Sequence, residues 1–314
     1  MKATTILIIL AALTISSCHH SKESNNNSRE NKNDSQEHKM NNPLIETRKV
    51  KQDSIIGYAP VNGLKMYYEI HGKGTPLVLI HGGGSTIQTS FGRVLHFFAK
   101  DRKVIAVELQ GHGHTADVNR PETFEQDADD VAALLKYLKI EKADFFGFSN
   151  GGNTTLDVAI RHPELVRKIV LGSVSYKKDG FYPEFWKYLK PATLKDMPQP
   201  LKDAYKKVAP DSNDLIKMFE KDKNRMLEFK DWKEKDIQSI EAPVFIIVSD
   251  EDVVRPEHAV EMFRLLPDAR LSILPGAHGA YIGEITTGME HSKIPELTVS
   301  MIEEFLNDPM PKKN

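Results

Sequence analysis

A serine, a carboxylate and a histidine in the second half of the chain have the types and the order that nucleophilic catalysis needs. Ser149 is the centre of the segment Gly147-Phe-Ser-Asn-Gly151, which follows an apolar run and precedes a stretch of helical periodicity. A serine between two glycines on a sharp strand-to-helix turn presents its hydroxyl to a substrate. Because a serine hydroxyl is a poor nucleophile until a base accepts its proton, this motif predicts a histidine and a carboxylate beside it in the fold.

Both partners follow apolar runs farther along the chain. The run 244–249 leads into the acidic residues 250–252, and a later run leads into His278. Since parallel strands end at the same edge of a sheet, we expect a carboxylate and His278 to lie beside Ser149. His278 would act as the general base, and the carboxylate would fix the tautomer of its imidazole. The spacing alone leaves open which acidic residue is the partner.

Short apolar runs rich in branched residues must form the framework that positions these side chains. We expect strands at residues 55–61, 65–71, 76–80, 104–109, 143–148, 169–172, 244–249 and 270–274. We expect helices at residues 91–99, 123–138, 150–162, 257–266 and 292–305. The first two strands are joined by Asn62-Gly63, a strong hairpin signal. Strands that alternate with helices predict an α/β fold, with a mostly parallel sheet and helices on both of its faces.

Residues 175–236 interrupt this alternation. The segment has no convincing strand, is rich in charged and aromatic residues, and holds both tryptophans of the chain. It predicts a helical cap with a small core of its own, whose inner face supplies an apolar pocket. The candidate wall residues of this pocket are Tyr176, Phe181, Phe185, Trp186, Phe219 and Val254.

Four motifs in order give the chain a resemblance to the α/β-hydrolase superfamily, from about residue 54 to 307. They are His81-Gly-Gly-Gly84, Gly111-His-Gly113, the segment around Ser149, and the pair of Asp252 and His278. The chain is most similar to the capped branch of esterases, lactonases and cofactor-free haloperoxidases. This resemblance implies a doubly wound sheet with the cap inserted between strands six and seven. It also implies chemistry that needs no cofactor and no metal.

The resemblance assigns the acidic partner of the histidine. In this branch the acid is the second aspartate of a Gly-Asp-x-Asp pattern, which corresponds to Asp252. Ser249 stands in place of the first glycine of that pattern, and Asp250 therefore stays an alternative.

The resemblance also assigns the groups that would stabilise a tetrahedral intermediate. The oxyanion donors would be the backbone N–H groups of Gly83 and Asn150, and His81 would be structural. His112 and His114 have a spacing that metal ligands also show, but no further ligand residues cluster with them in the sequence. We therefore interpret these two as loop histidines.

These features predict a serine hydrolase that cleaves a small carboxylic ester through an acyl-enzyme. A lactone is the second candidate substrate, and an amide or peptide is the third, for which acidic cap residues would hold a free amine. A binding protein that kept this fold and lost catalysis is the alternative of a different class.

The composition excludes several other classes of protein. The 314 residues include 42 Lys and Arg against 44 Asp and Glu, which gives a net charge of −2 and no basic surplus for nucleic acid. The hydrophobic content of 40% is typical of a globular domain. Cys18 is the one cysteine, and so no disulfide can form within the chain.

The N-terminal segment predicts export and a lipid anchor. Residues 1–17 contain Lys2 followed by an apolar run too short to span a bilayer, and Ser16-Ser17-Cys18 resembles a bacterial lipobox. We expect lipidation at Cys18, with attachment to a membrane of the bacterial cell envelope on the periplasmic or surface side. Residues 18–48 predict a disordered tether. The catalytic core would then comprise residues 49–174 and 237–310.

Overall fold

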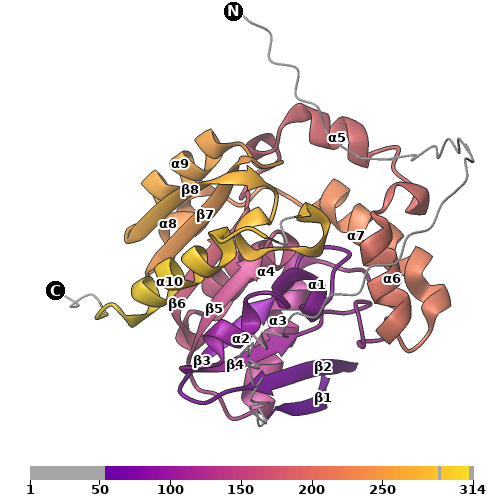
Figure 1. Cartoon of the computed structure of the whole chain (residues 1–314), viewed down its shortest axis with the longest axis horizontal. Coiled ribbons are helices and arrows are strands. Elements are labelled where there is room, and N and C mark those ends of the chain that lie inside the picture. The colour runs from indigo at the N-terminus through magenta and orange to yellow at the C-terminus, as the bar shows by residue number, and fades with distance from the viewer. Residues whose placement is uncertain (1–53, 289–290, 311–314) are drawn as a thin grey trace, which may run out of the picture. The chain divides into compact units, whose positions relative to one another are not determined.

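The framework of the protein is one eight-stranded sheet in the order β1-β2-β4-β3-β5-β6-β7-β8 (Figure 1). The computed structural model describes residues 54–288 and 291–310. The strands are β1 (Ile55–Val61), β2 (Leu64–His71), β3 (Thr75–Ile80), β4 (Arg102–Val107), β5 (Ala143–Phe148), β6 (Val166–Gly172), β7 (Val244–Glu251) and β8 (Ala269–Ala277). Cys18 and the predicted signal peptide and tether lie outside the described residues.

The six strands from β4 to β8 in the sheet order are parallel to one another. The strand β2 is antiparallel to both of its neighbours, β1 and β4. The predicted hairpin between β1 and β2 is confirmed, and its turn residues Asn62 and Gly63 both have positive φ angles, of 46° and 79°. All six residues of β5 are buried, including Asp144, which pairs with Arg102 and Arg167. A strand buried along its whole length is typical of a parallel sheet that is covered on both faces.

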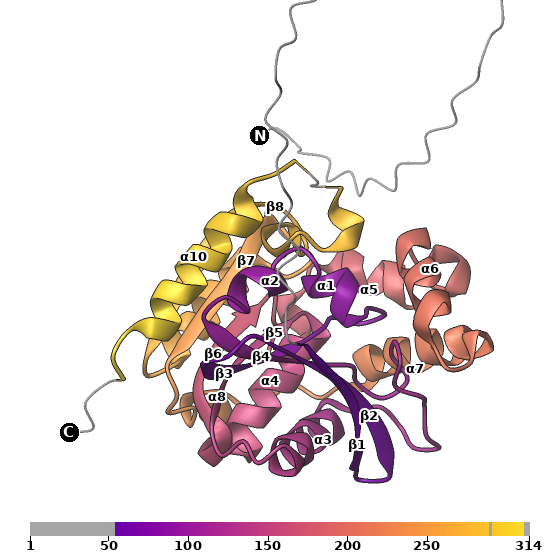
Figure 2. The ribbon, with the colours of Figure 1, turned by 60° about the horizontal axis from the view of Figure 1, so that its bottom comes forward.

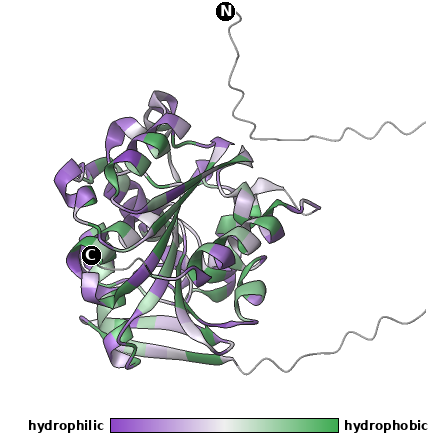
Figure 3. Cartoon of the chain, turned by 90° about the vertical axis from the view of Figure 1, so that its left-hand side faces the viewer, coloured by the Kyte–Doolittle hydropathy of each residue, from purple (hydrophilic) through white to green (hydrophobic). Residues whose placement is uncertain are grey.

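Helices cover both faces of the sheet (Figure 2). The helices are α1 (Ile87–Phe91), α2 (Leu95–Phe98), α3 (Phe124–Tyr137), α4 (Asn150–Arg161), α5 (Pro183–Leu189), α6 (Gln199–Val208), α7 (Leu215–Glu228), α8 (Glu234–Gln238), α9 (Pro256–Leu265) and α10 (Ile294–Asn307). Buried side chains of α3, α4, α8 and α9 form one core with the sheet. Those of α1, α2 and α10 form a second core on the opposite face. The hydropathy of the chain follows these layers, with apolar residues along the strands (Figure 3).

The predicted single helix at residues 91–99 is wrong. The segment contains the end of α1 and the separate short helix α2, because the first helix begins four residues earlier and stops at Gly92. Thr86 and Thr89 form a reciprocal capping box that starts α1 at Ile87. Glycine has a low helix propensity, which accounts for the stop.

The segment between β6 and β7 is helical, as the sequence predicts, and contains α5, α6 and α7. We call these three helices and their connecting turns the cap. It has its own small core of buried apolar residues, made of Met197, Leu201, Tyr205, Leu215 and Met218. The following helix α8 packs against α4 and α9 and belongs to the sheet layers. Across the described ranges we find no helix with the length and apolar character that a bilayer crossing requires.

Candidate active site

Ser149 lies at the turn between β5 and α4, in a strained backbone conformation with φ 54° and ψ −123°. The two flanking glycines make this turn possible because the backbone passes very close to them. A Cβ atom on Gly147 would lie 2.2 Å from the carbonyl oxygen of Gly151, and one on Gly151 would lie 2.2 Å from the carbonyl oxygen of Ile80. The turn therefore places the serine hydroxyl at the carboxyl edge of the sheet.

His278 and Asp252 meet Ser149 at this edge. The Nε2 atom of His278 lies 3.1 Å from the Oγ atom of Ser149, and its Nδ1 atom lies 2.6 Å from the Oδ1 atom of Asp252. Asp250 is exposed, and its carboxylate accepts a hydrogen bond from the backbone N–H of Gly276 at 2.8 Å. The structure thus brings together Asp252, rather than Asp250, with the histidine and the serine.

A network of donors holds the Asp252 carboxylate, whose residue is 5% exposed. The hydroxyl of Ser173 donates to its Oδ2 atom at 2.5 Å, and the backbone N–H of Val254 donates to Oδ1 at 3.2 Å. The hydroxyl groups of Ser173 and Tyr281 lie 2.9 Å apart. Burial raises the pKa of Asp252, but His278 and these donors lower it by more, and the net pKa lies below its usual value. The carboxylate is therefore ionised and oriented toward the imidazole.

The loop after β3 supplies the second part of the site. Gly83 and Asn150 line the same cavity as Ser149 and His278. Among the described residues we find no acceptor for the backbone N–H groups of Gly83 and Asn150. That of Asn150 is also the first N–H of α4, at the positive end of the helix dipole. These two donors are thus available to an anionic oxygen beside Ser149.

His81 stabilises this loop rather than facing the cavity. Its Nδ1 atom bonds to the carbonyl oxygen of Gly82 at 2.8 Å, and the backbone N–H of Leu109 donates to its Nε2 atom at 3.1 Å. Burial lowers the pKa of His81 to about 3, and the ring is therefore neutral. Its position agrees with the structural role that the resemblance implies.

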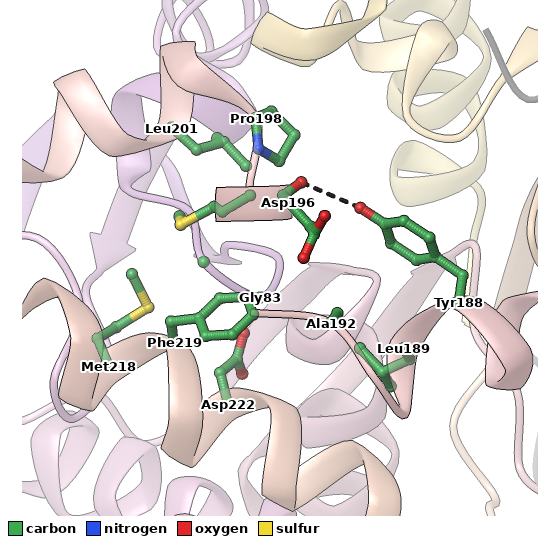
Figure 4. Close-up of a pocket in the computed structure, with 12 residues that line it drawn as sticks. Gly83, Tyr188, Leu189, Ala192, Asp196, Pro198, Leu201, Met218, Phe219 and Asp222 are labelled. Atoms are coloured by element: carbon green, nitrogen blue, oxygen red, sulfur yellow. Dashed lines mark hydrogen bonds between the residues drawn. The ribbon is translucent and has the colours of Figure 1, made fainter. Parts of the chain in front are cut away.

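Two adjoining cavities lie between the sheet edge and the cap. The one at Ser149 has a volume of about 200 Å³ and is also lined by Phe181, Phe185 and Met226. The other has a volume of about 160 Å³ and an apolar wall that includes Met218 and Phe219 (Figure 4). The residues Gly83 and Asp222 line both cavities. Of the six predicted wall residues, Phe181, Phe185 and Phe219 thus face a cavity.

The other three predicted wall residues line neither cavity. Tyr176 is 1% exposed and stacks on His258, and its hydroxyl donates to Glu261 at 2.7 Å. Trp186 packs against other aromatic rings of the cap and donates to the carbonyl oxygen of Lys178. Val254 is fully buried. Aromatic crowding in this segment therefore marks the core packing as well as the pocket wall.

The two histidines after β4, His112 and His114, are hydrogen-bonded within the loops. Residues 54–288 and 291–310 contain no group of three or more metal-ligating side chains that could hold an ion. The Nδ1 atom of His112 donates to the carbonyl oxygen of Gln110 at 2.8 Å, and His114 pairs with the buried Glu108 at 2.8 Å. Both residues thus serve to fix loops near the oxyanion donors.

A model of the family described as "alpha/beta hydrolase fold" matches residues 75–204, which include β3 to β6 and Ser149. The strand order, the strained turn at Ser149 between β5 and α4, and this family match all indicate the same fold. The fold is that of the α/β hydrolases.

Curated relatives match the chain over a limited segment. The 2-hydroxymuconate semialdehyde hydrolase of Pseudomonas sp. (strain CF600) is 37% identical over 115 residues, which is 35% of this chain and 40% of the relative. The human serine hydrolase BPHL is 36% identical over 126 residues, or 38% and 43% of the two chains. The chain therefore spans about two fifths of the length of these relatives. The enol-lactonase of Burkholderia xenovorans LB400 has the same fold, with a TM-score of 0.63 at 22% identity over 80% of this chain and all of that one.

The pKa of His278 sets the pH above which its imidazole can act as a general base. Burial lowers the pKa of the imidazole, but the Asp252 carboxylate raises it by more, and the net pKa lies above the ordinary value of 6.5. Since protonated imidazole cannot accept the serine proton, we expect kcat/KM to rise with pH through an acid limb centred above 6.5. A pH–rate profile of ester hydrolysis measures this limb. A flat profile from about pH 5 to 9 would contradict the assignment.

Sequence reasoning missed several residues of this site. Ser173 and Tyr281 support Asp252 from positions that carry no motif, and only the backbone φ of 55° at Ser173 marks it as unusual. Asp222 lines both cavities, but the many other charged residues of the cap hide it in the sequence.

Proposed function

We propose that this protein is a serine hydrolase that cleaves small carboxylic esters through a covalent acyl-enzyme. The observation that carries the proposal is the continuous hydrogen-bonded series from Ser149 through His278 to Asp252, next to two available backbone donors. This arrangement has a nucleophile, a base, an orienting carboxylate and a site for a developing oxyanion.

The geometry supports a two-step reaction. The Nε2 atom of His278 accepts the hydroxyl proton while the Oγ atom of Ser149 bonds to the ester carbonyl carbon. The carbonyl oxygen becomes an oxyanion, which the N–H groups of Gly83 and Asn150 stabilise. When the intermediate collapses, the C–O bond to the alcohol breaks and the alcohol takes the proton from His278. Water then attacks the acyl-enzyme with His278 as base, which releases the acid and restores Ser149.

The cavities support a small and partly apolar substrate. Their volumes are about 200 and 160 Å³, and most side chains in the second are apolar. The names of the matched relatives, 2-hydroxymuconate semialdehyde hydrolase and serine hydrolase BPHL, also favour hydrolysis over binding alone. An amide substrate with a free amine is less well supported, because both carboxylates that line the cavities are already engaged, Asp222 with Arg225 and Asp196 with Thr193.

A chain-length series of p-nitrophenyl esters tests the proposal, with a lactone and an anilide of the best acyl group alongside. We expect the wild type to cleave short acyl esters fastest and to lose activity once the chain exceeds the cavities. Cleavage of the lactone or the anilide with no ester cleavage would show that the substrate is a lactone or an amide and not an ester. No turnover of any probe would contradict the proposed function and favour the binding protein.

We further propose that the mature protein is held on a bacterial membrane through lipid on Cys18. The support is the lipobox-like sequence before this cysteine. We expect the full-length protein expressed in a bacterial host to sediment with membranes. The variant Cys18→Ala should appear in the soluble or uncleaved precursor fraction, since several acyl chains are what makes such binding stable. Acyl labelling of the wild type that persists in the variant would contradict the proposal.

A further inference from the structure

We propose that Asp222 of the cap is a positioning residue for the oxyanion hole, which it holds in place through the side chain of Asn150 and by contact with Gly83. This inference rests on the proposed serine hydrolase function and adds to it. If Asp222 holds the N–H groups of Gly83 and Asn150 in position, the cap takes part in catalysis, because Asp222 belongs to the cap helix α7.

The contacts on which this proposal depends converge from three segments. The Nδ2 atom of Asn150 donates to the Oδ1 atom of Asp222 at 2.9 Å. A Cβ atom on Gly83 would lie 2.4 Å from that Nδ2 atom and 2.5 Å from the Oδ2 atom of Asp222. The oxyanion loop therefore rests directly on the Asn150–Asp222 pair. Since Asn150 begins α4 and lines the cavity, we infer that its side-chain bond also holds its own peptide, whose N–H is the proposed oxyanion donor.

A carboxylate next to an oxyanion would oppose catalysis unless its charge were compensated. The structure supplies this compensation within the same helix. Arg225, one turn farther along α7, forms an ion pair with Asp222 and a second one with Asp127 of α3 at 2.5 Å. His112 lies 3.9 Å from the other oxygen of Asp222, and the buried Glu122 also faces this group of charges. Asp222 is thus fixed and paired, and its Oδ2 atom lies against both His112 and Gly83.

Two substitutions at Asp222 separate the effect of its hydrogen bonds from the effect of its negative charge. Oδ1 of Asp222 accepts the hydrogen bonds from both Asn150 and Arg225. An asparagine can keep both bonds with its amide oxygen, whereas an alanine loses both. We therefore expect Asp222→Asn to retain kcat within about threefold and Asp222→Ala to lower kcat by about 10- to 100-fold with a small change in KM. A misplaced oxyanion donor has effects of this size.

Lys221 provides a matched control on the same helix. Its Nζ atom bonds to Asp117 at 2.6 Å and to two backbone carbonyl groups of the loop after β4, so it also fastens the cap to the rest of the fold. It lines neither cavity. Lys221→Ala should therefore weaken the cap docking without moving the oxyanion donors. We expect its kcat to stay within about threefold of the wild type.

The experiment uses the full chain and two readouts, which together distinguish a positioning role of Asp222 from a purely structural one. One is kcat against KM for the best p-nitrophenyl ester. The other is the rate at which a fluorophosphonate modifies Ser149, a reaction that also places a charged oxygen among the same donors and needs no natural substrate. Asp222→Ala should slow both reactions by a similar factor. In an Asn150→Ala background the substitution should have little further effect, because the side chain through which it acts is gone.

Several results would overturn the inference. They are wild-type rates in Asp222→Ala, equal losses in Lys221→Ala, or losses in Asp222→Asn as large as those in Asp222→Ala. If Asp222→Ala does not fold, Asn150→Ala decides alone, and wild-type kcat in that variant contradicts the proposal. A wild type that cleaves no ester but reacts with the fluorophosphonate refutes the ester proposal alone, and the labelling rates still test Asp222. A wild type whose Ser149 does not react overturns both.

Discussion

Replacing Ser149 with alanine should lower kcat for the best ester by about 10⁴- to 10⁶-fold, to the level of residual hydrolysis by the cavity alone. The reason is that the attacking oxygen is removed, while the His278 imidazole and the oxyanion donors stay in place. Stability should change little, because serine and alanine carry the same strain at a φ of 54°, and the one hydrogen bond of the hydroxyl within the described residues is to His278. Burst and steady-state kinetics of p-nitrophenol release measure the loss, and thermal unfolding measures the stability.

Substitution of Ser173 gives a comparison for this prediction. Ser173 lines the same cavity as Ser149, but its hydroxyl donates to the carboxylate of Asp252 and not to a histidine that could act as its base. Ser173→Ala should therefore cost far less than Ser149→Ala. Retention of more than about a tenth of the wild-type kcat in Ser149→Ala would show that another group performs the attack.

The second large effect is expected at Asp252. The change Asp252→Asn preserves size but removes the charge that stabilises the imidazolium, and it favours the wrong imidazole tautomer. We expect kcat to fall by about 10³- to 10⁴-fold at neutral pH. The acid limb of the pH–rate profile should also move to lower pH, because the Asp252 carboxylate is what raises the pKa of His278 against the opposing effect of burial.

Asp250→Asn is the matched control, since Asp250 lies two residues away, is exposed, and accepts a hydrogen bond from the backbone N–H of Gly276. We expect this variant to keep kcat within about threefold and to leave the acid limb unchanged. The reverse pattern, with the large loss at Asp250, would contradict the geometry of the site.

The sequence contains enough information to predict the sheet and the main catalytic side chains. Buried parallel strands appear as continuous apolar runs, and the residues that follow them must meet at one edge of the sheet. This is why Ser149 and His278 could be placed together although they are 129 residues apart. The choice of Asp252 over Asp250 depended on a family pattern, because two acidic residues so close in sequence cannot be told apart by periodicity.

Features that depend on tertiary contacts could not be predicted in this way. Tyr176 and Trp186 are aromatic residues of the same segment as Phe181 and Phe185. Of these four, Phe181 and Phe185 face the cavity at Ser149. Asp222 is one acidic residue among many in the cap, and its role depends on where α7 docks. The start of α1 at Ile87 depends on local capping at Thr86, which a search for helical periodicity does not see.

Trapping of the acyl-enzyme is the measurement that tests the central claim most directly. The wild-type protein is mixed with a p-nitrophenyl ester, quenched in acid within the burst phase, digested and analysed by mass spectrometry. The proposed mechanism predicts one acyl group on the peptide that contains Ser149, and none in the variant Ser149→Ala. Turnover of the ester with no acylated peptide, or with the acyl group on another residue, would contradict it.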